Sequence, residues 1–268
     1  MITGISSACF YPMETEKAVK FCGELGFKNL EIFVNAEQEM QGSIFNDIKA
    51  TVNHYGINVC SVHPFTSTME SFTIFGSYSR RTDDTVEYYK KFFNFAAELN
   101  AGIFVLHGGN LHHTADNEEY FERYAKLYET GKQFGVTVSH ENVVDRRAQS
   151  PEFVKRMNDY LNGNFALTLD LKQCRRAGES PFDFIKLVGE KIVNVHISDY
   201  NEISDCLPPF EGKEDFKKII AALNEKNYSG EYLIELYSHN FKTAEQIKKA
   251  ALKLDNLFAK LMNKKITE

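Results

Sequence analysis

The feature that most constrains the fold of this chain is a regular alternation of short apolar runs with longer amphipathic segments. Eight runs of strand length recur along the 268 residues: ITGISSA, NLEIFV, NVCSVH, GIFVLH, VTVSHE, FALTLD, VNVHIS and EYLIEL. Between them, apolar residues recur at helical spacing over residues 14–25, 43–55, 83–99, 117–134, 151–160, 181–188 and 215–225. The pattern predicts an α/β protein in which each strand is followed by a helical segment.

Strict alternation of strand and helix is compatible with an open doubly wound sheet and with a closed (β/α)8 TIM barrel. The eight repeats favour the barrel, and the sequence has neither a Gly-x-Gly-x-x-Gly turn after its first strand nor a Gly-Lys-Ser/Thr phosphate loop. Length alone leaves one or two domains open, but no Pro-, Gly- or Ser-rich linker divides the chain. We expect a single barrel domain over residues 1–268, closed by a final helix over residues 243–263.

Composition limits the partners of such a barrel. The formal net charge of -6 makes the chain repel a phosphate backbone, so we expect no nucleic-acid partner. No secretory signal pattern and no apolar stretch long enough to span a bilayer is present, which predicts no membrane partner. The 5 cysteines are scattered without a Cys-x-x-Cys pair, as is typical of reduced thiols in a cytoplasmic protein. Whether the chain forms a homo-oligomer is left open.

Ionisable residues stand at the ends of the predicted strands. In a barrel, the carboxyl ends of the strands form the active site, and side chains alternate between the interior and the helix layer. This alternation turns Asp170 inward at the end of FALTLD and His196 inward in VNVHIS, whereas His140 has the opposite parity and is assigned to structure. The side chains placed at one mouth in this way are His63, His107, Glu141, Asp170, His196 and Glu235.

These side chains together point to a bound cation. Taken singly, Asp170 is also explained as a helix cap, and His63 or His107 as a hydrogen-bonded core histidine. Three carboxylates that converge without an obvious neutralising lysine would repel one another and lose hydration unless a cation lies among them. We therefore expect one divalent metal ion. An oxygen-rich set with one imidazole suits Mn²⁺, Co²⁺ or Mg²⁺, Zn²⁺ is also compatible, and we favour Mn²⁺.

Seven motifs in the same order give the chain a family resemblance: LGFKNLEIF, SVHPF, VLHGG, SHENV, LTLDLKQ, VHISD and NYSGEYLIEL. Over nearly its full length the chain resembles the xylose-isomerase-like barrel superfamily, in particular the sugar phosphate isomerase/epimerase family with its D-tagatose 3-epimerase-like enzymes. The resemblance implies that a single divalent ion is held by Glu141, Asp170, His196 and Glu235. It also implies that Glu141 and Glu235 are the catalytic acid/base residues.

The reaction expected of such a site is proton transfer at a carbon next to a carbonyl, through an enediolate. Return of the proton to the opposite face gives epimerisation, return to the adjacent carbon gives aldose/ketose isomerisation, and loss of hydroxide gives dehydration. The sequence leaves these three open. We expect a small sugar, sugar phosphate or polyol ketone as substrate, with His63, His107 and Gln173 in contact with its hydroxyl groups. Gln173 stands where the resembling epimerases usually place a histidine.

Several further residues have two interpretations. Phe10, Tyr11 and Phe65 follow strands and are candidates for an apolar wall, although aromatic residues at such positions are also common packing. Glu31 has inward parity, and a hydrogen-bonded structural role is favoured for it. The arginines that follow the ligand-bearing strands are either phosphate ligands or solvated loop charges: Arg146, Arg147, Arg175 and Arg176.

Two other functions remain as alternatives. Nuclease relatives of the endonuclease IV type share this fold and use three metals, but here the segment Asp170-Leu171-Lys172-Gln173 and the loop after His196 lack the additional histidines. We expect a second and third metal to lack ligands for that reason. The other alternative is a non-catalytic barrel that binds a sugar or a metal, and the presence of both Glu141 and Glu235 argues against it.

Overall fold

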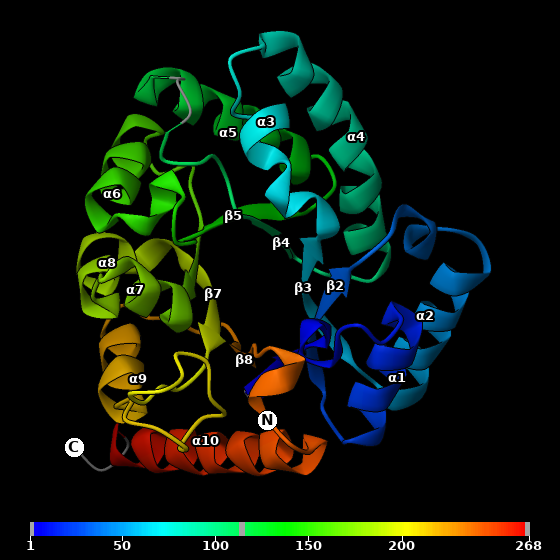
Figure 1. The fold of residues 1–268 in the computed structure, drawn as a ribbon, viewed down its shortest axis with the longest axis vertical. Helices are drawn as coiled ribbons and strands as arrows, with labels where there is room; N and C mark the ends of the chain where they lie inside the picture. Colours follow the sequence, from blue (N-terminus) through cyan, green and yellow to red (C-terminus); the bar gives the residue numbers. More distant parts are fainter. Residues whose placement is uncertain (1–2, 113–115, 266–268) are drawn as a thin grey trace.

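The computed structural model describes residues 3–112 and 116–265. In this part of the chain, parallel strands form a closed barrel in chain order, with β8 paired to β1. The strands are β1 (Thr3–Ser6), β2 (Asn29–Val34), β3 (Asn58–Pro64), β4 (Ile103–Leu106), β5 (Thr137–Glu141), β6 (Leu167–Asp170), β7 (Ile192–Ile197) and β8 (Tyr232–Ile234). The predicted (β/α)8 TIM barrel is confirmed (Figure 1).

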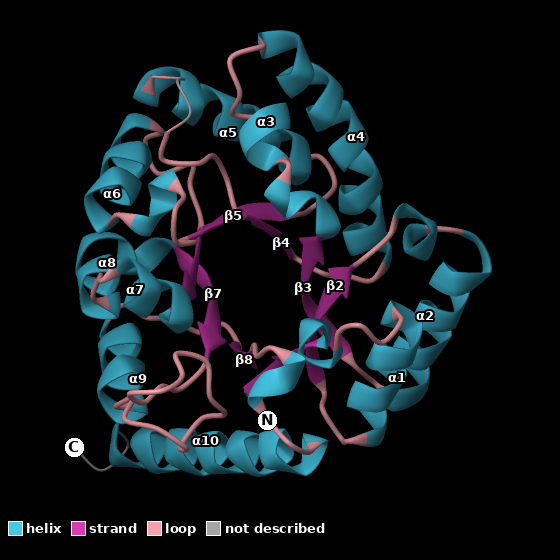
Figure 2. Cartoon of the chain, in the orientation of Figure 1, coloured by secondary structure: helices cyan, strands magenta, loops and turns pink. Residues whose placement is uncertain are grey.

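The helices form an outer ring around the strands (Figure 2). They are α1 (Thr15–Glu24), α2 (Gly42–Tyr55), α3 (Glu70–Thr73), α4 (Ser79–Glu98), α5 (Asn117–Lys132), α6 (Pro151–Tyr160), α7 (Leu171–Ala177), α8 (Pro181–Val188), α9 (Phe216–Glu225) and α10 (Ala244–Lys265). The helix predicted over residues 83–99 begins earlier, at residue 79, and the short helices α3 and α7 were not predicted. No helix in residues 3–112 and 116–265 is both long and apolar enough to cross a membrane.

Local sequence explains where several helices begin. The Ser150 hydroxyl accepts a hydrogen bond from the Phe153 amide and precedes Pro151, which occupies the first turn of α6. The same Ser-Pro pair, Ser180 with Pro181, begins α8. A capping oxygen satisfies an otherwise unpaired amide, and proline fits the first turn because its missing N–H would have no partner there. These caps fix where each helix meets the barrel.

An apolar layer lies between the strands and the helices. Around β4 it is aromatic: Tyr89, Phe92 and Phe93 of α4 pack edge-on against Phe104, and all four side chains are buried. Each such side chain contributes roughly 1.5–3 kcal/mol when it leaves water. This layer holds the helices on the barrel and leaves the carboxyl ends of the strands free to carry polar groups.

Strand register places the polar ends beside one another. Asp170 at the end of β6 pairs with His196 of β7, and Glu141 at the end of β5 pairs with Thr168 of β6. The β2–β3 and β6–β7 pairs each contain a register shift, beside Glu31 and Thr168. Residues far apart in the chain are thereby brought to one mouth of the barrel.

Candidate active site

Four polar side chains lie together at the carboxyl ends of the last four strands. Glu141 ends β5, Asp170 ends β6, His196 lies in β7 and Glu235 directly follows β8. One possible ligand atom from each residue lies within 4.8 Å of the others. They meet because the ends of parallel barrel strands share one face. The structure thus brings together all four residues that the family resemblance implies as metal ligands.

His196 is oriented by Glu31 of β2. Its Nε2 lies 3.1 Å from Glu31 Oε2, and the same oxygen accepts a hydrogen bond of 2.6 Å from the Ser61 hydroxyl. Burial raises the pKa of Glu31, but the charge of His196 and its hydrogen bond outweigh burial and leave the pKa below its usual value. The ionised carboxylate accepts the proton on Nε2 and so directs Nδ1 to the opposite side. This contact agrees with the hydrogen-bonded role favoured for Glu31.

Nδ1 of His196 faces three carboxylates. It lies 3.5 Å from Glu141 Oε1, 3.7 Å from Asp170 Oδ2 and 3.4 Å from Glu235 Oε2. Among the described residues, the buried His196 Nδ1 has no hydrogen-bond partner, and the buried oxygens Glu141 Oε2 and Asp170 Oδ2 have ion-pair partners at 3.1 Å and 3.2 Å, His107 and Lys172. Carboxylates that face one another in a buried site are costly unless cations lie among them. Three carboxylates and one imidazole therefore fit a divalent metal ion.

The charges of this cluster shift the pKa values of its members. Burial lowers the pKa of His196, but the charge of Glu31, with those of the other carboxylates, outweighs burial and holds the pKa well above its usual value. Burial raises the pKa of Glu141, but the charge of His107 and its hydrogen bond outweigh burial and hold the pKa well below its usual value. Glu141 is therefore ionised at neutral pH, which is the form that accepts a proton.

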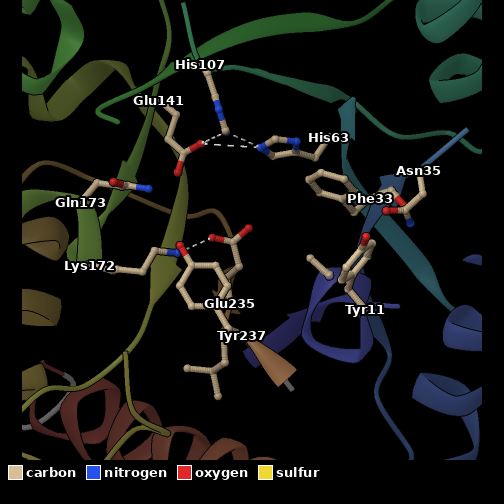
Figure 3. A pocket seen from close by; sticks show the side chains of 12 residues that line it. Tyr11, Phe33, Asn35, His63, His107, Glu141, Lys172, Gln173, Glu235 and Tyr237 are labelled. Carbon is tan, nitrogen blue, oxygen red and sulfur yellow. Dashed lines mark hydrogen bonds and ion pairs between the residues drawn. The ribbon is translucent and has the colours of Figure 1, made fainter. Parts of the chain in front are cut away.

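A buried lysine stands among these carboxylates, which corrects the expectation that no lysine neutralises them. Lys172 is 3% exposed, and its Nζ lies 3.2 Å from Asp170 Oδ2. The same Nζ lies 3.0 Å from Glu235 Oε2 (Figure 3). Burial lowers the pKa of Lys172, but the charges of Asp170 and Glu235 outweigh it and hold the pKa well above its usual value. Burial raises the pKa of Glu235, but the Lys172 charge outweighs it and holds that pKa well below its usual value. One ammonium balances only part of the carboxylate charge.

The geometry of Asp170 is compatible with both roles weighed for it. Its Oδ1 accepts a hydrogen bond of 2.9 Å from the Gln173 amide and so caps α7, while its Oδ2 faces Nδ1 of His196. The cap fixes the rotation of the carboxylate, since one oxygen is held by the helix and the other is directed at the cluster. A capping function and a ligand function are therefore compatible in this residue.

A cavity of about 280 Å³ opens at this mouth. It is lined by Ala8, Tyr11, Phe33, Asn35, His63, His107, Glu141, Lys172, Gln173, Glu235, Leu236 and Tyr237. Its size lies near the lower end of the range for small-molecule sites. Glu141, Lys172 and Gln173 form one side of the cavity, and Tyr11, Phe33 and Asn35 form the other (Figure 3). A ligand here would lie between this polar side and the aromatic side opposite, within reach of Glu235.

His63 and His107, both predicted as substrate contacts, line the cavity. Their Nε2 atoms lie 2.8 Å apart, and Glu141 Oε2 lies 3.7 Å from His63 Nε2 and 3.1 Å from His107 Nε2. These three residues form a second group that could hold a metal ion. The expectation that a second and third metal lack enough ligands rested on the histidines missing after β6 and β7, and beside this group it stays a prediction.

Gln173, the third predicted substrate contact, also lines the cavity. Its Oε1 accepts a hydrogen bond of 3.2 Å from the Val144 amide. The side-chain nitrogen is directed toward the middle of the cavity (Figure 3). Gln173 therefore offers a donor to a ligand, held in place from the loop after β5.

The predicted apolar wall is only partly correct. Tyr11 lines the cavity, but Phe10 packs against Phe21 and Phe65 against Phe92, away from the cavity lining. The wall is completed by Phe33, whose ring stacks on the His63 imidazole at 4.6 Å. Phe33 has the same inward parity on β2 as Glu31, so the alternation that identified Glu31 would also have identified Phe33.

The four arginines weighed as phosphate ligands are bound to protein groups, and none of them lines the described cavity. Their partners are Ser71 and Asn110 for Arg146, Asn117 and the ring of Tyr120 for Arg147, Glu214 and Ser198 for Arg175, and Asp205 and Tyr237 for Arg176. The interpretation of these arginines as structural loop charges is therefore favoured. Among the residues that line the described cavity, no arginine is present that could bind a phosphate group.

Comparisons with known proteins agree with this architecture. The family model described as xylose isomerase-like TIM barrel matches residues 19–257. A curated relative, the uncharacterized protein ML2432 of Mycobacterium leprae, is 22% identical, and the alignment covers 91% of each chain. Because this relative is itself uncharacterized, it indicates no function for the chain.

Solved structures share the fold at low sequence identity. A D-tagatose 3-epimerase-like protein superposes with a TM-score of 0.80 at 19% identity, covering 99% of this chain and 100% of the other. D-Psicose 3-epimerase of Clostridium cellulolyticum H10, solved with D-tagatose, gives 0.77 at 16% identity and 97% and 99% coverage. The probable 3-DHS dehydratase AsbF of Bacillus anthracis gives 0.76 at 15% identity and 96% and 99% coverage. With its family-model match over most of its length, the chain belongs to the xylose isomerase-like TIM barrel family.

Proposed function

We propose that this chain is a divalent-metal-dependent isomerase, either a ketose epimerase or an aldose/ketose isomerase. Its substrate is a small sugar, sugar phosphate or polyol ketone, and the reaction moves a proton at a carbon next to a carbonyl. The observation that carries the proposal is the arrangement of Glu141 and Glu235, which both line the cavity and both contribute to the cluster around His196 Nδ1. The epimerases and the dehydratase with the same fold support this class of reaction.

The metal would be held by Glu141, Asp170, His196 and Glu235, and we favour Mn²⁺, with Co²⁺, Mg²⁺ or Zn²⁺ as the other compatible ions. When bound, it supplies a Lewis acid that polarises the carbonyl and stabilises negative charge on oxygen. The convergence of the Glu141, Asp170 and Glu235 carboxylates on His196 Nδ1, within 3.4–3.7 Å, supports this site.

The two glutamates carry the proton in this proposal. Charged neighbours hold the pKa of each well below its usual value, so each begins as a carboxylate. Glu141 is buried between His107 and His196, while Glu235 lies beside Lys172, so the two approach the cavity from different strands. One takes a proton from one face of the substrate carbon. The other first takes up a proton from solvent at the open cavity and returns it to the opposite face, and the first then releases its proton to solvent.

The remaining cavity groups position the substrate. His63, His107 and the side-chain nitrogen of Gln173 are placed to contact hydroxyl groups. Lys172 brings a fixed positive charge 3.0 Å from Glu235, where it can also donate to the substrate oxygen that becomes negative. The aromatic face of Phe33 and Tyr11 covers the apolar side of a small ring or chain.

The test combines metal content with proton exchange. Purified wild type, His196→Ala and Glu235→Gln are analysed by mass spectrometry for bound metal, and a panel of ketohexoses and their phosphates is incubated with each in D₂O and followed by NMR. We expect about one Mn, Co, Mg or Zn per wild-type chain, its loss in His196→Ala, and deuterium incorporation next to the carbonyl only in wild type. Absence of specific metal after reconstitution of wild type would contradict the proposal.

The other outcomes identify the alternatives. An unsaturated product without a new stereoisomer indicates a dehydratase, and bound metal without exchange on any substrate indicates a non-catalytic binding barrel. The group of His63, His107 and Glu141 favours one more candidate, a nuclease of the endonuclease IV type. Two or more metals per chain together with cleavage of abasic DNA would establish that function instead.

A further inference from the structure

A hydrogen-bonded unit lies on the outer side of β4 and β5, behind the cavity. His140 of β5 is completely buried, and its Nε2 lies 2.7 Å from the hydroxyl of Tyr120 on α5. The Gly109 amide donates to the same hydroxyl at 3.0 Å. On its other side, Nδ1 of His140 lies 3.1 Å from the backbone oxygen of Glu141. Four groups are thus connected by hydrogen bonds into one unit, from the loop after β4 to the end of β5.

The positions of the protons in this unit follow from its chemistry. The Tyr120 oxygen accepts from the Gly109 amide, so its own hydrogen is free to donate to Nε2 of His140. Nδ1 faces a carbonyl oxygen, which only accepts, so Nδ1 carries the imidazole proton. Only this arrangement of protons gives every donor and acceptor in the hydrogen-bonded unit a partner.

Both ends of this hydrogen-bonded unit adjoin residues of the candidate active site. Gly109 lies two residues after His107, and His140 directly precedes Glu141. The side chains of His107 and Glu141 are in contact, with 3.1 Å between His107 Nε2 and Glu141 Oε2. The outer unit therefore fixes the backbone on both sides of a contact that lies inside the cavity.

The loop after β4 fits closely against this unit. A Cβ added to Gly108 would lie 2.4 Å from His140 Nε2 and 2.4 Å from the Tyr120 hydroxyl, and Gly108 has a φ of +81°. Its amide also donates to Glu70 Oε2 at 2.6 Å. Only glycine fits such a position without strain, because any side chain would collide with the imidazole. The β4 loop and β5 therefore cannot shift independently of each other.

We propose that Tyr120 and His140 are positioning residues that hold His107 and Glu141 in contact and thereby set the affinity of Glu141 for the metal. The proposal rests on the proposed function, because it assigns the metal to Glu141. Neither side chain lines the cavity, so both act through the backbone of the residues beside them. Groups that orient a metal ligand typically change metal affinity by 10–100-fold when they are removed.

Tyr124 provides a matched control on the same helix. It is completely buried, donates to the Val138 carbonyl at 2.7 Å and accepts from the Ala166 amide at 3.1 Å. Tyr120→Phe and Tyr124→Phe therefore each remove a buried hydroxyl with two hydrogen bonds. Both rings stack on His140 and are kept in the variants, but only the Tyr120 hydroxyl is hydrogen-bonded to the imidazole. A general loss of packing or stability would affect both variants alike.

The experiment measures Mn²⁺ affinity by calorimetry and thermal unfolding of wild type and both variants. We expect similar losses of thermal stability, with Mn²⁺ bound about tenfold more weakly by Tyr120→Phe and unchanged in Tyr124→Phe. If Tyr120→Phe does not fold, His140→Asn takes its place, since it keeps a donor for the Glu141 carbonyl but loses the acceptor for Tyr120. Equal Mn²⁺ affinities in the Tyr120 and Tyr124 variants would overturn the inference.

Crystal structures of the two variants separate this inference from the proposed function. If wild type binds no metal, the proposed function fails, but the His107–Glu141 distance still tests the positioning role. We expect the distance to lengthen in Tyr120→Phe and to stay as in wild type in Tyr124→Phe. An unchanged distance in both variants would show that the outer unit does not position these residues.

Discussion

The two faces of the barrel strands provide different surroundings for buried histidines. His196 faces the interior and His140 faces the helix layer, and both are almost completely buried. The pKa of His196 is held well above its usual value, because the carboxylate of Glu31 and those around it outweigh burial, whereas burial lowers the pKa of His140 to about 4. Burial alone therefore does not set the charge of these imidazoles, and the neighbouring groups decide it.

This difference extends to the two layers as a whole. At the carboxyl ends of the strands, the interior holds four carboxylates and one buried ammonium, contributed by Glu31, Glu141, Asp170, Lys172 and Glu235. Around His140, the outer layer holds aromatic side chains and neutral hydrogen bonds with Tyr120 and backbone groups. We expect substitutions in the interior to act through charge and metal binding, and those in the outer layer to act through geometry.

The largest effect is expected from Lys172→Met, which removes the only ammonium that the described structure places between Asp170 and Glu235. Uncompensated buried charges cost roughly 3–5 kcal/mol, so we expect a loss of this size in the free energy of unfolding without metal. Saturating Mn²⁺ should recover a large part of it. Chemical denaturation with and without Mn²⁺ measures both quantities.

An exposed ion pair provides the control for this substitution. Lys155 pairs with Asp159 on α6, and the two side chains are 45% and 58% exposed. Water screens such a pair, so Lys155→Met should cost at most about 1 kcal/mol and show no dependence on Mn²⁺. Equal losses in the two variants would mean that the interior charges are no more costly than those on the surface.

The next effect tests a buried acid outside the interior cluster. Glu70 of α3 is completely buried and accepts a hydrogen bond from the Gly108 amide, and burial raises its pKa to about 8. A folded-state pKa above the unfolded value means that the folded state binds the proton more tightly. The stability is complete below the unfolded pKa and is lost as the pH rises through the folded one, between about pH 4.5 and 8.

Glu70→Gln should remove this loss, because glutamine resembles the protonated acid. We expect the free energy of unfolding of wild type to fall with rising pH by up to about 1.4 kcal/mol per unit more than that of Glu70→Gln. Urea unfolding at pH 5, 6 and 7 measures the two slopes. Parallel slopes would show that Glu70 is ionised in the folded protein. It would then resemble the charged carboxylates of the barrel interior.

A smaller effect is expected from Glu31→Gln. The variant keeps a hydrogen-bonding group near His196 Nε2 but removes the charge that orients the imidazole. Loss of such a partner should weaken Mn²⁺ binding by 10–100-fold, or about 1.4–2.8 kcal/mol. Calorimetric titration of Mn²⁺ into both proteins measures this ratio. An unchanged affinity would show that the charge of Glu31 does not affect metal binding and that its role is purely structural.

Strand periodicity predicted much of this arrangement. The barrel, the inward parity of Asp170 and His196 and the outward parity of His140 all follow from alternation along short strands. The convergence of Glu141 and Glu235 follows as well, because the ends of parallel strands must meet at one mouth. The roles of these residues as ligands or bases remain proposals.

Residues beyond the strand ends could not be placed in this way. Lys172 lies on α7, a short helix that begins directly after Asp170, and its side chain returns toward the carboxylates. Strand parity says nothing about the direction of a side chain on a helix, so the neighbours of Lys172 could not be predicted from it. The contact between His63 and His107 was missed for a related reason, since alternation gives the direction of each side chain but not the distance between two of them.

The order of the strands makes the group of Glu141, Asp170, His196 and Glu235 a reporter of late barrel assembly. All four of its members come from β5 to β8, and Glu235 follows the strand that pairs with β1. During synthesis the first half of the chain therefore emerges with none of the four, and the set is complete only once β8 has emerged and paired with β7. The absorption of bound Co²⁺ would accordingly record the arrival of the last strand rather than the formation of any single strand–helix unit.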